Sequence, residues 1–167
     1  MAAERRAWFD ELVASRSPAL LRSAYLLTGD WAMAEDLLQT ALVKIWFART
    51  GLREPAAAEA FVRTTMTRLF VSWRRRRWRG EVPTERMPEP ATDGQLGGVE
   101  DRDSLRRALA RLPARTRAMV VLRFYDDLTE AQVAELLGCS VGTVKSTVSR
   151  ALAQLRRPAT ATNPEGS

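Results

Sequence analysis

The 167-residue sequence contains no histidine and only one cysteine, Cys139. Without histidine there is no imidazole to act as a general base, to complete a catalytic triad or to build an ordinary zinc site. One thiol cannot form an internal disulfide, which fits a reducing cytoplasm. No apolar run approaches the roughly 20 residues that span a bilayer, and no signal peptide is recognisable. We expect a soluble, cytoplasmic protein that is not an enzyme and uses no metal, cofactor or small-molecule substrate.

Lysine is also scarce, and the positive charge is concentrated in two parts of the chain. Lysine occurs only at Lys44 and Lys145, so 24 of the 26 basic residues are arginines, and the formal charge is +6. Residues 61–80 hold seven arginines and no acid, and residues 141–157 hold four bases and no acid. Between them, residues 81–104 carry seven acids against two arginines. Two basic blocks around an acidic connector are typical of a protein that contacts a polyanion at two places.

Apolar residues recur with a helical period on both sides of the connector. The pattern predicts helices over residues 8–27, with a break near Pro18, over 31–49 and over 59–78. No segment alternates as a β-strand does, so the predicted fold class is all-α. The connector is rich in proline and glycine and has almost no large apolar residue, so it cannot offset its ordering entropy. The sequence therefore divides into a domain at 1–79, a flexible acidic linker at 80–103, a domain at 104–157 and a disordered tail at 158–167.

The C-terminal domain carries the sharpest motif, a helix-turn-helix. Thr129 and Gln132 predict a capping box, Gly138 is expected to end that helix in a left-handed conformation, and Ser140 caps a second helix. The buried side of the second helix is expected to include residue 141 and the valines and leucines that follow at helical spacing. Polar residues near its start point away from that side, as in a helix that reads base edges in the major groove. The predicted DNA-binding residues are Ser140, Thr143, Lys145, Ser146, Ser149 and Arg150.

Five arginines among residues 74–79 are interleaved with Trp73 and Trp78. Arginine neutralises phosphate, and aromatic rings stack on unpaired bases with about 1–3 kcal/mol per base. The pattern favours nucleic-acid binding. The alternative is a solvated helix end with Trp73 in the core.

The helix predicted at 31–49 is apolar almost all round in its final turns, while Asp36 and Gln39 mark a polar edge. A surplus apolar stripe is either buried within its own domain or offered to a partner. Elsewhere, Asp126 and Asp127 are interpreted as a turn ahead of the capped helix and not as a catalytic pair, and Cys139 as a small buried filler.

These blocks, in this order, resemble bacterial sigma factors of the extracytoplasmic-function (ECF) group of the sigma-70 family, which has only regions 2 and 4. AEDLLQTALVKIWF resembles the region 2 helix that grips the clamp helices of RNA polymerase, and EAFVRTTMTRLFVSWRRRRWR resembles the part of region 2 that opens and reads the −10 promoter element. The stretch from LRRALARL to SRALAQL resembles region 4, which reads the −35 element. The resemblance implies a region 2 helical bundle and a region 4 helix-turn-helix joined by a linker, and a factor that directs core RNA polymerase to promoters.

The resemblance also implies site residues and partners. Thr40 replaces a usual Glu of the family, and Thr67, Arg68 and Ser72 replace a familiar Arg-Asn pair and Asp, so the −10 base preference stays open. The implied partners are promoter DNA and core RNA polymerase, through the clamp of its β′ subunit and its β flap. An anti-sigma factor is a further candidate, and no membrane is expected. The implied polymerase contacts are Asp36, Gln39, Val43 and Phe47. The implied −10 contacts are Arg68, Ser72, Trp73, Arg74, Arg75, Arg76, Arg77 and Trp78.

Two other functions stay open from the residues alone. A self-sufficient helix-turn-helix regulator would bind a palindrome as a dimer without polymerase, but it leaves the arginine–tryptophan block unexplained. An RNA-binding adaptor would explain only that block.

Overall fold

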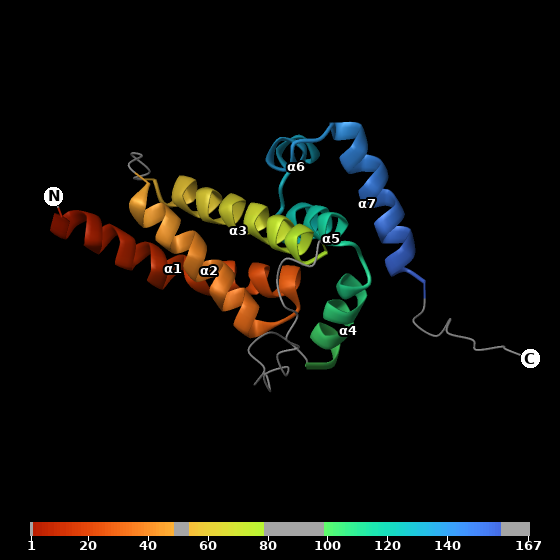
Figure 1. The fold of residues 1–167 in the computed structure, drawn as a ribbon, viewed down its shortest axis with the longest axis horizontal. Helices are drawn as coiled ribbons and strands as arrows, with labels where there is room; N and C mark the ends of the chain where they lie inside the picture. The colour runs from red at the N-terminus through yellow and green to blue at the C-terminus, as the bar shows by residue number, and fades with distance from the viewer. Residues whose placement is uncertain (1, 49–53, 79–98, 158–167) are drawn as a thin grey trace, which may run out of the picture.

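The computed structural model shows helices packed in two units, and it describes residues 2–48, 54–78 and 99–157 (Figure 1). The bounds of the N-terminal unit are α1 (Ala2–Thr28), α2 (Trp31–Phe47) and α3 (Pro55–Trp78). The bounds of the C-terminal unit are α4 (Val99–Ala110), α5 (Ala114–Val120), the π-helix η1 (Val121–Tyr125), α6 (Glu130–Leu137) and α7 (Val141–Leu155). No described residue lies in a β-strand, and the all-α prediction is confirmed.

The helix-turn-helix of α6 and α7 has the predicted local structure. The Thr129 hydroxyl accepts a hydrogen bond from the backbone N–H of Gln132, whose side chain accepts one from the backbone N–H of Thr129. Gly138 ends α6 with φ 67°, in the left-handed region that glycine adopts without strain. The Ser140 hydroxyl then accepts a bond of 3.1 Å from the backbone N–H of Thr143. These caps confirm where both helices begin and where the first one ends.

Helix α1 is continuous, so the predicted break near Pro18 is wrong. A proline removes one internal hydrogen bond, but packing on both sides of it can hold a helix together. Here Leu12 and Leu20 are both buried in the core. After α1, Gly29 turns the chain with φ 73°, and Asp30 caps α2 through its carboxylate.

Helix α4 begins at Val99, inside the stretch predicted as a linker. Asp103 forms ion pairs with Arg106 and Arg107, at the helical spacings i+3 and i+4 that favour this helix. The rest of the predicted linker, from residue 79 to 98, and the tail from 158 lie outside the described residues.

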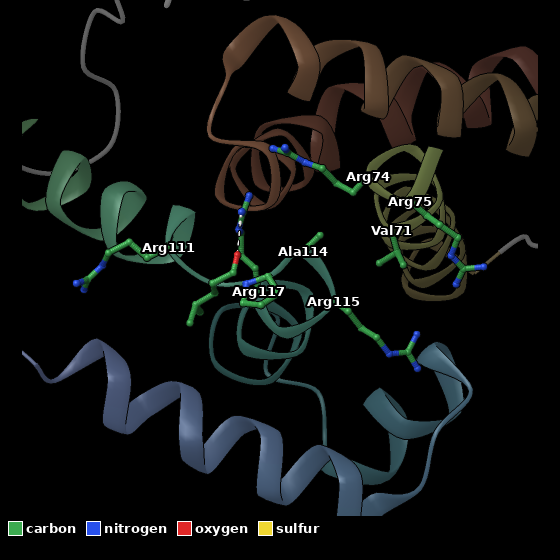
Figure 2. A pocket seen from close by; sticks show the side chains of 9 residues that line it. Val71, Arg74, Arg75, Arg111, Ala114, Arg115 and Arg117 are labelled. Carbon is green, nitrogen blue, oxygen red and sulfur yellow. Dashed lines mark hydrogen bonds between the residues drawn. The ribbon is translucent and has the colours of Figure 1, made fainter. Parts of the chain in front are cut away.

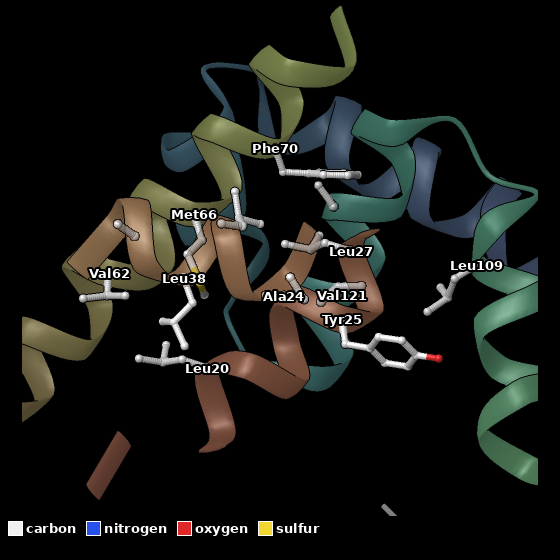
Figure 3. Packing of buried hydrophobic residues seen from close by; sticks show 14 of the residues in the cluster. Leu20, Ala24, Tyr25, Leu27, Leu38, Val62, Met66, Phe70, Leu109 and Val121 are labelled. Carbon is white, nitrogen blue, oxygen red and sulfur yellow. The ribbon is translucent and has the colours of Figure 1, made fainter. Parts of the chain in front are cut away.

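One hydrophobic core runs through both units (Figure 3). In the N-terminal unit it includes Leu20, Leu27, Met66 and Phe70, all almost completely buried. The C-terminal unit adds buried residues from α4, α5, η1 and α7, namely Leu109, Leu112, Ala118, Val120, Val121 and Ala151. A smaller cluster belongs to the C-terminal unit alone and consists of Met119, Leu122, Val133, Ala134, Val144 and Val148. The segment α5–η1 contributes to both clusters and therefore joins the helix-turn-helix to the N-terminal unit.

Candidate nucleic-acid interface

The predicted recognition face lies on α7 and is exposed. Val144, Val148 and Ala151 form the buried stripe of this helix. The exposed residues on its other sides include Thr143, Lys145, Ser146, Ser149 and Arg150. Val141 is an exception to the prediction, because it is 39% exposed and not buried. As the first residue of α7, it lies ahead of the contacts that bury the stripe.

Local hydrogen bonds hold the start of α7 in a defined geometry. Besides the cap, the hydroxyl groups of Ser140 and Thr143 lie 2.9 Å apart, and the Ser146 hydroxyl donates to the carbonyl of Thr143. The ammonium group of Lys145 lies 3.8 Å from a carboxylate oxygen of Glu130 on α6. This ion pair is largely exposed, so it contributes little to stability. It would not prevent Lys145 from binding a phosphate.

The arginine block lies on α3, where it divides between two sides of the helix. The buried stripe runs through Met66 and Phe70, and Trp73 continues it, half-buried against the main core. Trp73 therefore fits the alternative reading of a core residue. The outward side carries Arg68, Ser72, Arg75 and Arg76, whose spacing of three to four residues places them on one helix face. The side chains of Arg77 and Trp78 lie outside the described part of the structure.

The outward face of α3 meets the C-terminal unit at the end of α6. The Arg68 guanidinium donates to the carbonyl of Leu136 at 3.4 Å, and Arg115 from α5 donates to the carbonyl of Leu137 at 2.7 Å. The last carbonyls of a helix lack internal partners and carry partial negative charge, which suits a guanidinium. A cleft of about 370 Å³ beside these contacts is lined by residues that include Ser72, Arg75, Arg115 and Glu135. The helix-turn-helix thus contacts the predicted −10 face at Arg68, although Arg68, Arg75 and Arg76 are themselves exposed.

A larger cavity of about 750 Å³ lies between the end of α3 and the turn from α4 to α5 (Figure 2). Among the described residues, no carboxylate lines it. Five arginines do, two from α3 and three from the C-terminal unit, namely Arg74, Arg75, Arg111, Arg115 and Arg117. In Figure 2 the side chains of Arg75 and Arg115 extend toward the same side, while Arg111 extends away from them. Positive charge from both units therefore faces one space.

Arg117 is the buried one of these five arginines, and it donates hydrogen bonds to backbone carbonyls of both units. It donates to Leu109 and Leu112 in its own unit, at 2.9 and 3.1 Å, and to Leu27 at the end of α1, at 2.7 Å. Burial, and secondly the charge of Arg74, lower the pKa of Arg117 to about 10. Arg117 therefore remains a cation at neutral pH, and its cost of burial is offset by these charge-assisted hydrogen bonds.

The predicted polymerase-binding residues share one exposed face of α2. Asp36, Gln39, Val43 and Phe47 are spaced by three or four residues, and Val43 and Phe47 are 54% and 72% exposed. Trp46 accounts for the rest of the surplus apolar surface, because its ring packs edge-on against Phe9 at 5.0 Å. The surplus apolar surface of α2 is therefore divided between the two alternatives. One side packs within its own unit, and the other is exposed and could contact a partner.

Asp126 is the residue whose importance the sequence did not reveal. The predicted turn is present, with Asp127 at φ 56°, but the Asp126 side chain is only 5% exposed. The Ser23 hydroxyl on α1 lies 3.1 Å from both of its carboxylate oxygens, and the Arg63 guanidinium on α3 lies 3.4 Å away. Burial raises the pKa of Asp126 to about 6, although Arg63 and Ser23 oppose the increase. The paired acids were a visible signal, but nothing in the sequence indicated partners 103 and 63 residues away.

Cys139, interpreted as a buried filler, is half-buried in the turn and packs against the smaller cluster. Among the described residues, no group of three or more histidine, cysteine or acidic side chains could hold a metal ion. None of the described helices has the length and apolar character needed to cross a membrane.

An exposed polar face on the second helix of a helix-turn-helix, together with an arginine face on a separate helical unit, defines a helical protein suited to DNA at two places. Matches to known sequence families identify the protein more narrowly. Residues 12–80 match Sigma-70 region 2, and residues 102–155 match Sigma-70, region 4.

Known proteins are similar in sequence to this chain over most of its length. It is 42% identical over 148 residues to the RNA polymerase sigma-E factor of Streptomyces avermitilis, covering 89% of this chain and 83% of that protein. It is 35% identical over 160 residues to the ECF RNA polymerase sigma factor SigL of Mycobacterium tuberculosis, covering 93% and 88%. The sigma factor RpoE of Bartonella quintana, solved in complex with the anti-sigma factor NepR, superposes with a TM-score of 0.66 at 29% identity, covering 88% of this chain and 93% of that one.

The chain belongs to the ECF group of the sigma-70 family. This confirms the resemblance to sigma factors, and it decides against a self-sufficient helix-turn-helix regulator. The related sigma factors are not catalytic enzymes.

Proposed function

We propose that the protein binds core RNA polymerase in the cytoplasm and directs it to a set of promoters, without catalytic activity of its own. The observation that carries this proposal is the presence of two DNA-suited faces, on α3 and α7, in one chain of the sigma-70 family. A third exposed face on α2 is available for the polymerase. The division of labour follows the predicted domains, with residues 1–79 for polymerase and −10 DNA and residues 104–157 for −35 DNA.

The −35 element is assigned to α7. Lys145 and Arg150 would neutralise phosphates, while Thr143, Ser146 and Ser149 would approach base edges in the major groove. Ser140 acts mainly through its cap, which fixes the first turn of α7. A short polar surface with two cations fits a groove reader that uses phosphate contacts for position and hydroxyl contacts for specificity.

The −10 element is assigned to α3. Arg68, Ser72, Arg75 and Arg76 share its outward face and would follow the backbone of the melted strand. Arg74 and Trp73 lie beside this face, and Trp73 would contribute mainly through packing. Arg77 and Trp78 complete the proposed set, with Trp78 as the candidate platform for an unpaired base.

The polymerase contact is assigned to Asp36, Gln39, Val43 and Phe47 on α2, facing the clamp of the β′ subunit, with the C-terminal unit facing the β flap. An exposed apolar pair beside a carboxylate suits a partner helix with an apolar stripe and a basic edge. The structurally similar RpoE of Bartonella quintana was solved with an anti-sigma factor, and we include such a regulator among the partners.

A binding selection from a random duplex library, with and without core polymerase, tests the proposal. We expect the protein and polymerase together to enrich DNA with two conserved elements, and permanganate to detect unpaired thymines at the downstream one. Enrichment of palindromes by the protein alone would contradict it. A Trp78→Ala variant that binds polymerase but melts the selected promoter normally would remove Trp78 from the site.

A further inference from the structure

The cavity between the end of α3 and the turn from α4 to α5 includes residues that the proposed function does not use (Figure 2). Arg111, Arg115 and Arg117 line it from the C-terminal unit, and none of them belongs to a proposed DNA face. Its volume of about 750 Å³ is in the range of pockets that hold small ligands. The cavity is therefore large enough to enclose a small organic molecule.

Positive charge gathers around this cavity without matching negative charge. In the part of the chain that the structure describes, no acidic side chain lines it, and Arg75 and Arg111 form no ion pair. Burial lowers the pKa of Arg117, and the charge of Arg74 lowers it further, so two of the guanidinium groups already repel each other. An anion in this space would relieve that repulsion and would be attracted by all the surrounding cations.

The arginines differ in what they can offer to an anion. Arg117 donates its N–H groups to backbone carbonyls of both units, so it contributes charge and no direct contact. Arg115 donates one N–H group to the carbonyl of Leu137 and keeps further donors for a ligand. Arg75 extends toward the same side as Arg115 (Figure 2). Arg111 extends away from them, but it is exposed, and exposed side chains change rotamer within nanoseconds. Three guanidinium groups can therefore meet a phosphate-bearing ligand, and two parallel N–H groups of each suit a phosphate.

The remaining lining residues are apolar, namely Val71, Leu112, Pro113 and Ala114. Val71 and Ala114 pack against the main core, but both are only half-buried. A bare inorganic anion would leave this apolar surface in contact with water. A ligand that carries an aromatic ring beside its phosphates would cover it, and a guanidinium plane can also stack on such a ring.

We propose that this cavity binds a nucleoside polyphosphate, with the phosphates on Arg75, Arg111 and Arg115 and the base against Val71 and Ala114. Two or more phosphates are required because the guanidinium groups come from both units and lie on different sides of the cavity. The ligand would be a bound effector, neither a substrate nor a cofactor. The inference goes beyond the proposed function, because the site takes a small molecule and is independent of promoter DNA.

Two matched pairs of variants test the site, one pair on each unit. On α3, Arg75→Gln removes a charge that lines the cavity, and Arg76→Gln removes the charge of the next residue, which is not among the described lining residues. In the C-terminal unit, Arg111→Gln is compared with Arg107→Gln, whose surface ion pair with Asp103 contributes little to stability. All four arginines are exposed, so the variants should fold, and far-ultraviolet circular dichroism checks this.

The full-length proteins are titrated with adenosine triphosphate by isothermal titration calorimetry in about 0.15 M salt, which screens non-specific attraction between exposed charges. We expect one site per chain. Arg75→Gln and Arg111→Gln should each weaken binding about tenfold, as for one lost charge-assisted hydrogen bond, and Arg76→Gln and Arg107→Gln by less than about twofold. Tripolyphosphate, which has no ring, should bind about tenfold more weakly than adenosine triphosphate, and adenosine should show no measurable binding.

Different results overturn different parts of the proposal. If the parent protein does not bind adenosine triphosphate, or if all four variants lose affinity equally, the cavity is not the site, since equal losses indicate attraction to positive charge in general. A loss with Arg75→Gln and none with Arg111→Gln would place the ligand on the outward face of α3 and contradict a site between the units. Equal affinities for tripolyphosphate and adenosine triphosphate would show that the apolar lining takes no part and would overturn the nucleoside assignment.

Discussion

The two candidate DNA faces differ in the core on which each is built and in their contacts with the rest of the chain. The α7 face is built on a cluster that belongs to the C-terminal unit alone, and its polar residues are exposed. The α3 face is built on the core that both units share, and one of its arginines already binds the end of α6. A reader of duplex DNA can remain exposed at all times. A surface for unpaired DNA is needed only after melting, and in this structure it is the face that contacts the other unit.

The largest effect is expected at Phe70, where the shared core supports the α3 face. Phe70 is 1% exposed, and its ring centre lies 5.8 Å from the Arg117 guanidinium. Phe70→Ala therefore leaves a cavity in the core that both units share. We expect it to lower the free energy of unfolding by about 3–5 kcal/mol, measured by urea denaturation. Phe47→Ala is the control, because an exposed phenylalanine should change the same quantity by less than about 0.5 kcal/mol. Equal losses at the two positions would contradict the assigned core.

The next effect concerns the α2 face, which neither unit covers. Asp36→Arg is expected to weaken binding to core polymerase about tenfold or more, because it reverses the charge beside the apolar contact. Helical content should not change, since Asp36 is exposed. Pull-down with core polymerase measures the effect, and Asp10→Arg provides the same change of charge elsewhere. Polymerase binding that survives Asp36→Arg would remove this face from the interface.

Most of the fold was predictable because its signals are local. The capping box at Thr129, the left-handed Gly138 and the cap at Ser140 fix the helix-turn-helix from neighbouring residues. The continuity of α1 through Pro18 was not predictable, because it depends on packing against other helices. The expected burial of Val141 also failed, since a periodic pattern does not show where tertiary contacts to a helix begin.

The candidate faces were predictable as residue types and not as a spatial arrangement. Helical spacing alone places Asp36 and Phe47 on one side of α2. In contrast, the pairing of Asp126 with Ser23 and Arg63, and that of Arg68 with the end of α6, join residues far apart in the chain. Such contacts leave no periodic signal in a single sequence, so the contact between the α3 face and α6 appeared only in the structure.

A smaller effect should separate the two DNA faces directly. Arg150→Ala is expected to reduce the salt dependence of duplex binding by about 0.9 in the log–log slope, as for one lost phosphate contact. Arg75→Ala removes the same charge from α3, which a duplex selected through α7 is not expected to contact. We expect it to leave that slope unchanged, as measured by fluorescence anisotropy over a salt series. Equal slopes for the two variants would show that both faces contact the duplex.

The smallest effect is the pH dependence of the contact between the units. In the closed form, in which Asp126 contacts Ser23 and Arg63 as in this structure, the pKa of Asp126 is raised to about 6 from an ordinary value of 3.8, mainly by burial. Its surroundings are Ser23 on α1 and Arg63 and Glu59 on α3, and exposure on opening would return the carboxyl group to its ordinary range. Between these two pKa values the closed form binds more protons than the open form, so acidification favours closure.

We expect this closure to be stabilised by roughly 1 kcal/mol on going from pH 7 to pH 5, which is visible as a smaller radius of gyration and weaker single-strand binding. Asp126→Asn carries no titrating group at this position and resembles the protonated carboxyl, so the variant should be at least as compact at pH 7 as the parent protein and should lose most of the pH response. The difference between the two proteins isolates the contribution of Asp126. If both proteins respond equally, Asp126 does not govern the contact; if the parent protein opens on acidification, the sign assigned to its pKa is wrong.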